Sequence, residues 1–224
     1  MKATLTAALL LALVGVVAAE TPAPKTSPAM PDSPKLEKAT FGAGCFWGVE
    51  YQYAKIPGVV SAFSGYAGGK VLNPTYRQVS AEGTGHQESV LVRFDNSRLA
   101  YATLLRAYWR NIDPFDGRGQ FCDKGDSYRP VIFTADAVQA QQARSAIEAA
   151  ARELGKPIAA LRVTVKPLER FWPAEGYHQR YAQRNPLLYN YYRFRCGRDQ
   201  RLDQVWGSRA RGSLPWVVPS QPRP

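Results

Sequence analysis

Cys45 is the side chain in this sequence with the clearest potential for chemistry. It follows Gly44 in a glycine turn, and a helical repeat of apolar residues begins at Phe46, so we predict that Cys45 lies at the start of a helix. Free backbone amides and the positive end of the helix dipole at this position favour a thiolate over a thiol. A dinucleotide-binding fingerprint fails because Trp47 stands where the third glycine belongs. The alternative is a small apolar residue packed beside two aromatic rings.

Two further clusters carry polar groups that could assist a reactive thiol. Glu88 follows His86 at the head of an apolar strand, and a carboxyl group held against aromatic walls has a raised pKa and can act as an acid near neutral pH. A polar loop farther along the chain contains Asp123 and Tyr128. The alternatives are a solvated carboxylate at a strand edge, a structural histidine, and side chains that only hold the loop in shape.

The number of cysteines limits how many of them can form disulfides within the chain. The three cysteines are Cys45, Cys122 and Cys196, and an odd number leaves at least one thiol outside a permanent intramolecular pair. We expect no metal site, because the cysteines and the two histidines, His86 and His178, have spacings unlike those of compact ligand pairs.

Composition and charge restrict the class of protein. The chain has 224 residues, of which 45% are hydrophobic and 12% aromatic, which excludes disorder, collagen and a disulfide-dense miniprotein. The net charge is +11, but the arginines are scattered along the chain, which favours solvated surface over a nucleic-acid or other polyanion site.

The two ends of the chain differ from its middle. Lys2 precedes an apolar run that ends on small residues, which predicts a cleavable signal peptide over residues 1–19 and export to the periplasm or the medium. A membrane anchor is the alternative, but about 15 residues cover roughly 22 Å, less than the ~30 Å hydrocarbon core. Prolines predict a linker over 20–36, and 209–224 is predicted to be a poorly ordered tail. One domain remains over 37–208.

The elements that must position these groups alternate between strands and helices. Apolar periodicity predicts strands at 38–43, 59–67, 88–94, 131–134 and 161–165, and helices from 46 and over 99–112, 136–154 and 175–184. A long polar loop spans 113–128, and loops of this length in compact domains are often functional. The interleaved pattern indicates a two-layer α+β domain.

Four segments, in this order and spacing, resemble those of peptide methionine sulfoxide reductases of the A type, the MsrA family. They are GCFWGVE from Gly44, NPTY from Asn73, GHQE from Gly85 and QFCDKGDSYR from Gln120, and the likeness covers about residues 41–186. The resemblance implies an α+β fold, a two-layer sandwich around a mixed β-sheet with a ferredoxin-like core and extensions. It also implies thiol-dependent reduction of the S epimer of methionine sulfoxide, in oxidised proteins and as the free amino acid.

The resemblance also implies catalytic roles. Cys45 would attack the sulfoxide sulfur as a thiolate, Glu88 would protonate the oxygen, and Tyr76 and Tyr128 would donate hydrogen bonds to it. Each of these residue types meets one need of the reaction: a soft nucleophile, an acid, and donors that hold the departing oxygen.

The substrate pocket follows from the same comparison. Phe46 and Trp47 would form the wall around the methyl group, and Asp123 would organise the loop and its waters at the substrate-binding site.

Release of methionine would leave Cys45 as a sulfenic acid, which a second thiol can convert into a disulfide. Family members commonly carry the resolving cysteine on a C-terminal segment, which favours Cys196, and Cys122 is the alternative. This sequence departs from members whose glycine-rich tail bears two cysteines. We expect no bound cofactor and an external reductant, either thioredoxin-like or a membrane-embedded thiol donor.

Two other classes of protein compete with this interpretation. One is a cysteine hydrolase in which His86 or His178 serves as the base for Cys45, and the other is an exported basic binding module with a static disulfide. For the reductase we expect oxidised proteins bearing methionine sulfoxide as partners, no nucleic acid, no stable membrane insertion after signal cleavage, and a monomer.

Overall fold

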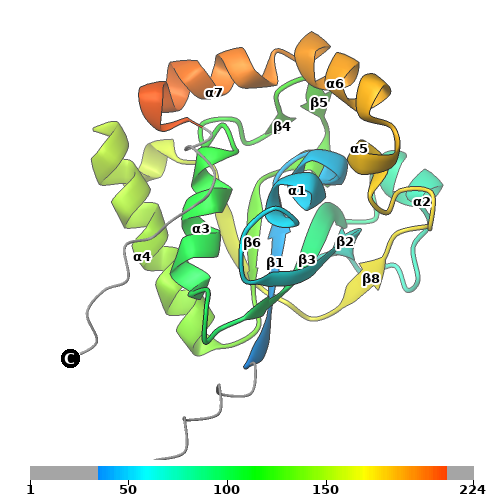
Figure 1. The fold of residues 1–224 in the computed structure, drawn as a ribbon, viewed down its shortest axis with the longest axis horizontal. Coiled ribbons are helices and arrows are strands. Elements are labelled where there is room, and N and C mark those ends of the chain that lie inside the picture. Colours follow the sequence, from blue (N-terminus) through cyan, green and yellow to red (C-terminus); the bar gives the residue numbers. More distant parts are fainter. Residues whose placement is uncertain (1–34, 211–224) are drawn as a thin grey trace, which may run out of the picture. The chain divides into compact units, whose positions relative to one another are not determined.

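A six-stranded mixed β-sheet organises the part of the chain that the structure, a computed structural model, describes, residues 35–210 (Figure 1). All neighbouring strands are antiparallel except β6 and β7, which are parallel. Across the sheet the order is β7 (Thr164–Pro167), β6 (Val131–Thr134), β1 (Leu36–Gly42), β3 (Gln87–Asp95), β2 (Val59–Ala67) and β8 (Phe171–Pro173). The inner order β6-β1-β3-β2 is that of a ferredoxin-like core, and β7 and β8 extend it, so the predicted fold class is confirmed.

The terminal segments lie outside the described residues. These are the predicted signal peptide, the predicted linker up to residue 34, and the predicted tail from residue 211. Within residues 35–210, none of the helices has the length and apolar character needed to span a bilayer.

Aromatic side chains join the sheet to the helical layer. Phe41 of β1 stacks on Tyr53 of α1 (Phe46–Tyr53), with ring centroids 5.0 Å apart. On its other side it approaches Tyr101 and Tyr108 of α3 (Tyr101–Arg110), at 6.2 and 5.6 Å. Because these rings are buried, they fix both helices against one face of the sheet. The strand that ends just before Cys45 is therefore held rigidly in the core.

The helix α4 (Ala137–Leu154) is the longest element of residues 35–210, and it begins one residue later than the predicted range of 136–154. At its start Asp136 caps the helix and accepts a 2.7 Å hydrogen bond from the backbone N–H of Gln139. At its end Gly155 takes the left-handed conformation, with φ of 62°, that closes many helices. The helix α4 packs beside α3 and against β6 and β7.

Several short elements were not predicted. The helix α2 (Tyr76–Ser80) begins at a capping box made by Thr75 and Gln78. The long loop folds into the hairpin β4 (Gly119–Gln120) and β5 (Asp123–Lys124), followed by a 3₁₀ turn at Asp126–Tyr128.

The strand predicted over 161–165 is displaced toward the C-terminus. Its pairing with β6 begins at Thr164, opposite Val131. The preceding backbone is occupied elsewhere, because the N–H of Arg162 donates a 2.7 Å hydrogen bond to the carbonyl of Pro114 in the long loop.

The helix predicted over 175–184 is mostly wrong. Only α5 (Tyr181–Arg184) is helical, because Arg180 has a φ of 52° and its N–H donates to the buried carboxylate of Glu50 at 3.0 Å. Pro186, two residues after the end of the predicted helix, is the first residue of the next one, α6 (Pro186–Arg195). A proline suits this first position because the N–H that it lacks would have no helical partner there.

The helix α7 (Arg198–Trp206) completes the C-terminal region, and the 3₁₀ turn Gly207–Arg209 follows it. Figure 1 shows α6 and α7 across the end of the sheet at which β1 passes into α1. This pair of helices therefore covers the end of the domain that carries Cys45.

Candidate active site

Cys45 lies where the sequence predicts it, at the N-cap position of α1 immediately after β1. The turn depends on Gly44, which has a φ of 79° and whose missing Cβ would lie 2.6 Å from the Cβ of Gln120. Cys45 is a free thiol with only 7% of its surface exposed. The glycine turn therefore brings the backbone next to Cys45 into close contact with the long loop.

The resting state of Cys45 differs from the prediction of a favoured thiolate. Burial raises the pKa of the thiol well above its usual value, and the nearby carboxylates of Glu88 and Asp123 raise it further. The N–H of Trp47 and the hydroxyl of Tyr192 lower it, but by less. The helix terminus favours a thiolate, but burial and the two carboxylates have the larger effect on the pKa of Cys45. Cys45 is therefore protonated at neutral pH.

Glu88 is buried directly beside the start of α1. It is 3% exposed, and its Oε2 accepts a 3.0 Å hydrogen bond from the N–H of Phe46. Burial raises the pKa of Glu88 to about 8, because it outweighs the stabilising Phe46 N–H, and the charge of Asp123 adds to the increase. The predicted rise in pKa is confirmed, and the alternative of a solvated strand-edge carboxylate is wrong. Glu88 carries a proton that it can donate at neutral pH.

Tyr76 and Tyr128 present two hydroxyl groups to this site. They are hydrogen bonded to each other, and burial followed by the charge of Glu88 raises the pKa of both. In its thiolate form, Cys45 raises the pKa of both hydroxyls further. The structure thus brings together the thiol, the acid and the two neutral donors that the four sequence segments carry.

Glu175 supports Tyr76 and was not predicted. One carboxylate oxygen accepts a 2.8 Å bond from the N–H of Tyr76, and the other accepts a 2.8 Å bond from the hydroxyl of Tyr66. Burial alone would raise the pKa of Glu175, but these donors and the nearby His178 outweigh it and lower the pKa. Glu175 therefore fixes the start of α2 as a charged acceptor.

Tyr192 is a further site residue that the sequence did not reveal. Its hydroxyl donates a short hydrogen bond to Oδ2 of Asp123 and also contacts the sulfur of Cys45. Burial raises the pKa of Tyr192, and the thiolate form of Cys45 and the carboxylate of Asp123 raise it further. Asp123 thus holds Tyr192 over the thiol, a more specific task than the loop organisation that was predicted.

Phe46 and Trp47 form an apolar wall that other rings support. Trp47 stacks on Tyr181 of α5, with centroids 3.8 Å apart and planes 14° apart. Its indole N–H donates a 3.1 Å hydrogen bond to Nδ1 of His178. The buried ring of Phe46 lies 4.9 Å from the His178 ring. Their rigid placement suits a slot for a small apolar group.

Neither histidine has the contacts of a base for Cys45. His178 accepts the Trp47 N–H, and burial lowers its pKa. The ring nitrogens of His86 face backbone groups, the N–H of Gly69 at 3.1 Å and the carbonyl of Val71 at 2.8 Å. This geometry does not favour the hydrolase alternative.

Cys122 and Cys196 are joined in a disulfide, with Cα atoms 4.9 Å apart across 74 residues of sequence. Cys122 lies in the turn between β4 and β5 and is exposed, and Cys196 is the C-cap of α6. The odd cysteine count is therefore distributed as one buried thiol and one disulfide.

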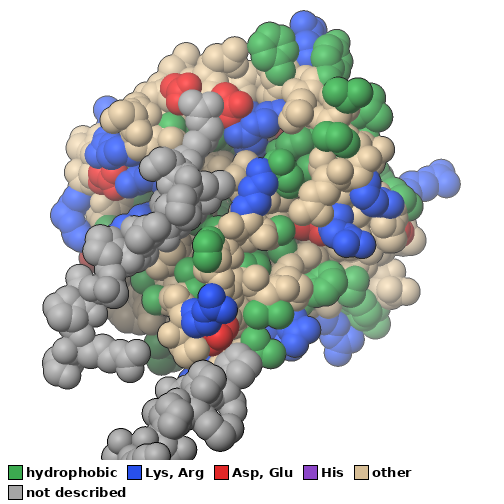
Figure 2. All heavy atoms as spheres, in the orientation of Figure 1, with side chains coloured by type: hydrophobic (Ala, Val, Ile, Leu, Met, Phe, Trp, Pro, Cys, Tyr) green, Lys and Arg blue, Asp and Glu red, His purple; other side chains and the backbone are tan. Residues whose placement is uncertain are grey.

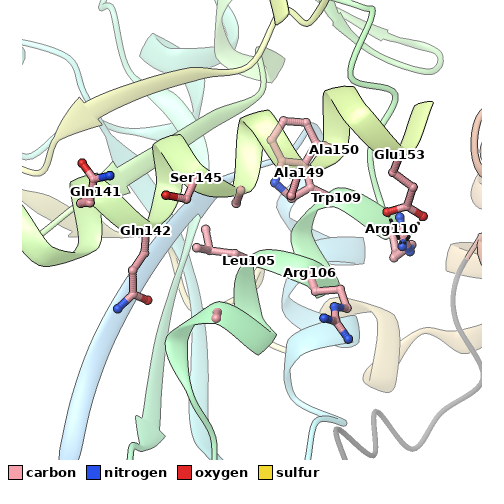
Figure 3. Close-up of a pocket in the computed structure, with 12 residues that line it drawn as sticks. Leu105, Arg106, Trp109, Arg110, Gln141, Gln142, Ser145, Ala149, Ala150 and Glu153 are labelled. Atoms are coloured by element: carbon pink, nitrogen blue, oxygen red, sulfur yellow. Dashed lines mark hydrogen bonds and ion pairs between the residues drawn. The ribbon is translucent and has the colours of Figure 1, made fainter. Parts of the chain in front are cut away.

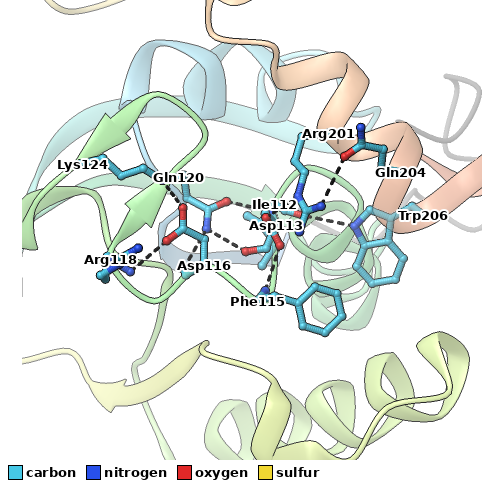
Figure 4. A network of polar contacts seen from close by, with 10 residues as sticks. All are labelled: Ile112, Asp113, Phe115, Asp116, Arg118, Gln120, Lys124, Arg201, Gln204 and Trp206. Carbon is cyan, nitrogen blue, oxygen red and sulfur yellow. Dashed lines mark hydrogen bonds and ion pairs between the residues drawn. The ribbon is translucent and has the colours of Figure 1, made fainter.

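A polar network fixes the loop that carries Cys122 (Figure 4). The side chain of Gln120 accepts the N–H of Asp113 and donates to its carbonyl, both at 2.8 Å. Arg201 of α7 donates a 2.6 Å bond to the Asp113 carboxylate, and the Trp206 indole donates to the carbonyl of Ile112 at 3.0 Å. The loop and α7 therefore form one supported unit.

Arg198 lies in this unit and is buried, although the sequence placed it among solvated arginines. It donates a 2.8 Å bond to the carbonyl of Asn111 and rests 4.4 Å over the ring of Phe121. Burial lowers the pKa of Arg198. Burial raises the pKa of Asp123, and the charge of Arg198 offsets part of that increase. It supplies a positive charge beneath the site.

Within residues 35–210, one group of side chains has ligand atoms close enough for a metal ion: Cys122, Asp123 and Cys196, within 4.8 Å of one another. Both sulfurs belong to the disulfide, so they are not available as thiolate ligands.

A groove of about 380 Å³ lies elsewhere, between α3 and α4 (Figure 3). Leu105, Trp109 and Ala150 form its floor, and Arg106 and Glu153 stand at its rim. It contains none of the predicted site residues and is separate from the Cys45 site.

Comparisons with known proteins agree with this geometry. The family model described as "Peptide methionine sulfoxide reductase" matches residues 37–210. The chain belongs to this family. Peptide methionine sulfoxide reductase MsrA 2 of Caulobacter vibrioides is 47% identical over 182 residues, covering 81% of this chain and 91% of the relative. Its counterpart in Rhizobium meliloti is 47% identical over 175 residues, covering 77% and 84%.

Solved structures of the same family share the fold. Methionine sulfoxide reductase A of Corynebacterium diphtheriae is 35% identical, with a TM-score of 0.64, covering 70% of this chain and 78% of that one. Reduced Mxr1 from Saccharomyces cerevisiae is 27% identical, also with a TM-score of 0.64, covering 73% and 90%. Membership of the methionine sulfoxide reductases makes this chain an oxidoreductase and disfavours both the hydrolase and the static binding module.

Proposed function

We propose that this enzyme reduces the S epimer of methionine sulfoxide to methionine, in oxidised proteins and as the free amino acid. The observation that carries the proposal is the juxtaposition of a buried thiol, Cys45, with a carboxyl group whose pKa is raised to about 8, Glu88. A thiol nucleophile and a protonated acid are the two groups that removal of a sulfoxide oxygen requires.

The other side chains complete the site. Tyr76 and Tyr128 donate hydrogen bonds to the sulfoxide oxygen while Glu88 protonates it, and Phe46 and Trp47 enclose the methyl group. The Cys45 sulfur attacks the sulfur of the substrate, which is reduced by two electrons and leaves as methionine. Cys45 is oxidised by two electrons and takes up the sulfoxide oxygen as a sulfenic acid, and the proton that its thiol gives up replaces the proton that Glu88 donated.

Cys196 then resolves the sulfenic acid, forming a Cys45–Cys196 disulfide and releasing water. Two features support this choice over Cys122. Tyr192, one helical turn before Cys196, already contacts Cys45. Cys196 adjoins Gly197, which has a φ of 61° and more backbone freedom than other residue types, whereas Gln120 anchors the loop of Cys122.

The Cys122 thiolate completes the relay by attacking Cys196, which returns Cys45 to a free thiol. The product of this exchange is the pairing present in the structure, a Cys122–Cys196 disulfide with Cys45 reduced. A thioredoxin-like or membrane-embedded dithiol then reduces the exposed disulfide and is itself oxidised.

Residues 1–19 support export of the enzyme to the periplasm or the medium, without stable membrane insertion after signal cleavage. We propose that it acts there as a monomer. Its substrates there are oxidised proteins.

The test is an assay of the reduced enzyme with dithiothreitol on peptides that carry separate S and R epimers of methionine sulfoxide. We expect turnover of the S epimer alone and none by Cys45→Ser. Absence of S turnover, or full activity of Cys45→Ser, would falsify the proposal. Thiol titration before and after substrate addition distinguishes the reductase from a protein with a static disulfide, whose thiol content would not change.

A further inference from the structure

The helix α6 has two faces of different character. Its inner face packs on the active site: Tyr189 is buried, and Tyr192 meets the ring of Trp47 edge-on at 6.1 Å. Its outer face consists of Leu187, Leu188, Tyr191 and Phe194, which are 84%, 62%, 66% and 71% exposed. Figure 2 shows hydrophobic side chains gathered at the upper right, over the position of α6 in Figure 1.

The outer face of α6 is unusual for a protein surface. Single exposed apolar side chains are common, but a contiguous group usually marks an interaction site. Leu187, Tyr191 and Phe194 follow the i, i+4, i+7 spacing that aligns side chains along one stripe of a helix. These side chains contribute little to folding because they remain in water.

The position of the stripe indicates its partner. Its last member, Phe194, lies two residues before Cys196, the C-cap of α6, and Cys196 is bonded to the exposed Cys122. A protein that reduces this disulfide must bring its own thiolate to the same place. We propose that the outer face of α6 is the docking surface for that dithiol protein, an inference that rests on the proposed function.

Charged side chains near the disulfide indicate which side chains the partner carries. Arg195 is exposed beside Phe194. Lys124, on the hairpin that carries Cys122, has about half of its side chain exposed but already pairs with Asp116, so Arg195 is the main positive group at this end of the stripe. The fitting partner therefore has an apolar surface around its dithiol and acidic side chains at the edge of that surface. Redox encounters of this kind use small interfaces, which a single helix stripe can supply.

The exposure of Cys122 determines which sulfur of the Cys122–Cys196 disulfide the partner attacks first. The partner thiolate attacks the exposed sulfur of Cys122, forming a mixed disulfide with Cys122, and Cys196 leaves as a thiolate. The second partner thiol then attacks the partner's own sulfur in that mixed disulfide, and Cys122 leaves as a thiolate. The partner becomes a disulfide, and both enzyme cysteines are reduced by two electrons in total.

An oxidised protein substrate is the other class of macromolecule that could use this face. It must deliver its sulfoxide to Cys45, which lies behind the inner face of α6 among Tyr76, Tyr128 and Tyr192. Exposed Tyr177 beside His178 lies on that substrate side. The outer face points away from these groups, which favours the reductant.

The test uses the full chain with Leu187→Ser, Phe194→Ser and the control Val138→Ser, which alters a side chain on α4 that is 65% exposed. The reductant is either thioredoxin, kept reduced by NADPH and its reductase, or dithiothreitol. We expect each α6 variant to raise the KM for thioredoxin about tenfold and to leave the dithiothreitol-supported rate unchanged. Val138→Ser should match the unaltered enzyme in both assays.

Three results would overturn the inference. One is an unchanged KM for thioredoxin in both α6 variants. Another is no thioredoxin-supported turnover by the unaltered enzyme. The third is a raised KM for an oxidised protein in the dithiothreitol assay with an unchanged KM for thioredoxin, which would assign the face to substrates. Absence of dithiothreitol-supported turnover by the unaltered enzyme is a separate result, because it contradicts the proposed function and not only the docking surface.

Discussion

The backbone N–H of Phe46 donates a 3.0 Å hydrogen bond to Oε2 of Glu88. Since Phe46 directly follows Cys45, this bond ties the acid on β3 to the first turn of the helix that carries the nucleophile. The N–H stabilises a charged carboxylate, but burial outweighs it and keeps the pKa of Glu88 near 8. The proton donor and the thiol are thus parts of one rigid unit.

Glu88→Gln should lower the single-turnover rate about 100-fold, because the amide keeps the acceptor for Phe46 but cannot donate a proton of suitable acidity. In the unaltered enzyme the rate should fall as the pH rises through about 8, where Glu88 loses its proton. Methionine formed by the reduced enzyme without reductant is the measurement. A Glu88→Gln profile that keeps the same fall near pH 8 would contradict the assignment.

The same pKa predicts a linkage between pH and folding. The pKa of Glu88 is raised from 4.5 to about 8 in the folded state, so its contribution to stability is full below about 4.5 and is lost as the pH rises through about 8. In urea unfolding, the free energy of unfolding of Glu88→Gln should therefore fall less than that of the unaltered protein as the pH rises from about 4.5 to about 8. Equal losses in the two proteins would count against a buried, protonated Glu88.

Tyr192→Phe should slow alkylation of Cys45. The hydroxyl lowers the pKa of the Cys45 thiol, so its removal raises that pKa further and reduces the thiolate fraction. We expect about a fivefold slower reaction with iodoacetamide at pH 8, followed by mass spectrometry of the Cys45 peptide. Tyr191→Phe, on the outer face of α6, is the matched control. Faster alkylation in Tyr192→Phe would mean that the ring mainly shields the thiol.

Tyr76→Phe and Tyr128→Phe should each reduce the single-turnover rate roughly 100-fold, about 3 kcal/mol of transition-state stabilisation. Each variant removes one donor to the sulfoxide oxygen while the ring remains. Tyr177→Phe is the control, because its exposed ring lies on the same side of the site. Rates within twofold of the unaltered enzyme for both variants would remove the tyrosines from the mechanism.

The relay predicts the yield of methionine in the absence of reductant. The fully reduced enzyme should form about two equivalents, one stored as the Cys122–Cys196 disulfide and one as oxidised Cys45. Cys122→Ser should form about one equivalent and contain a Cys45–Cys196 disulfide by mass mapping. If Cys196→Ser instead gives a Cys45–Cys122 disulfide, Cys122 is the resolving cysteine.

Local sequence patterns predicted several elements of the fold and the position of Cys45. The strand β2, the strand β6 and the helix α4 occur at the predicted residues, and Cys45 is at the predicted helix start. In each case the signal lies within a few neighbouring residues: alternation, a cap or a glycine turn.

Contacts across long stretches of sequence were beyond such patterns. Tyr192 reaches Cys45 from 147 residues away, and Arg198 is buried by Phe121 and Asn111 rather than by its neighbours in sequence. The thiolate prediction failed for the same reason, because burial of Cys45 depends on residues distant in sequence. Pro186 was ambiguous, because a proline can end one helix and start another.

The burial of Cys45 affects how long the enzyme survives where oxidants are abundant. Hydrogen peroxide attacks thiolates and oxidises exposed ones irreversibly to sulfinic and sulfonic acids. A protonated, enclosed thiol is a poor target for that attack, so the features that raise the pKa of Cys45 also protect it between substrates. The enzyme can remain active in the presence of the oxidants whose damage it repairs.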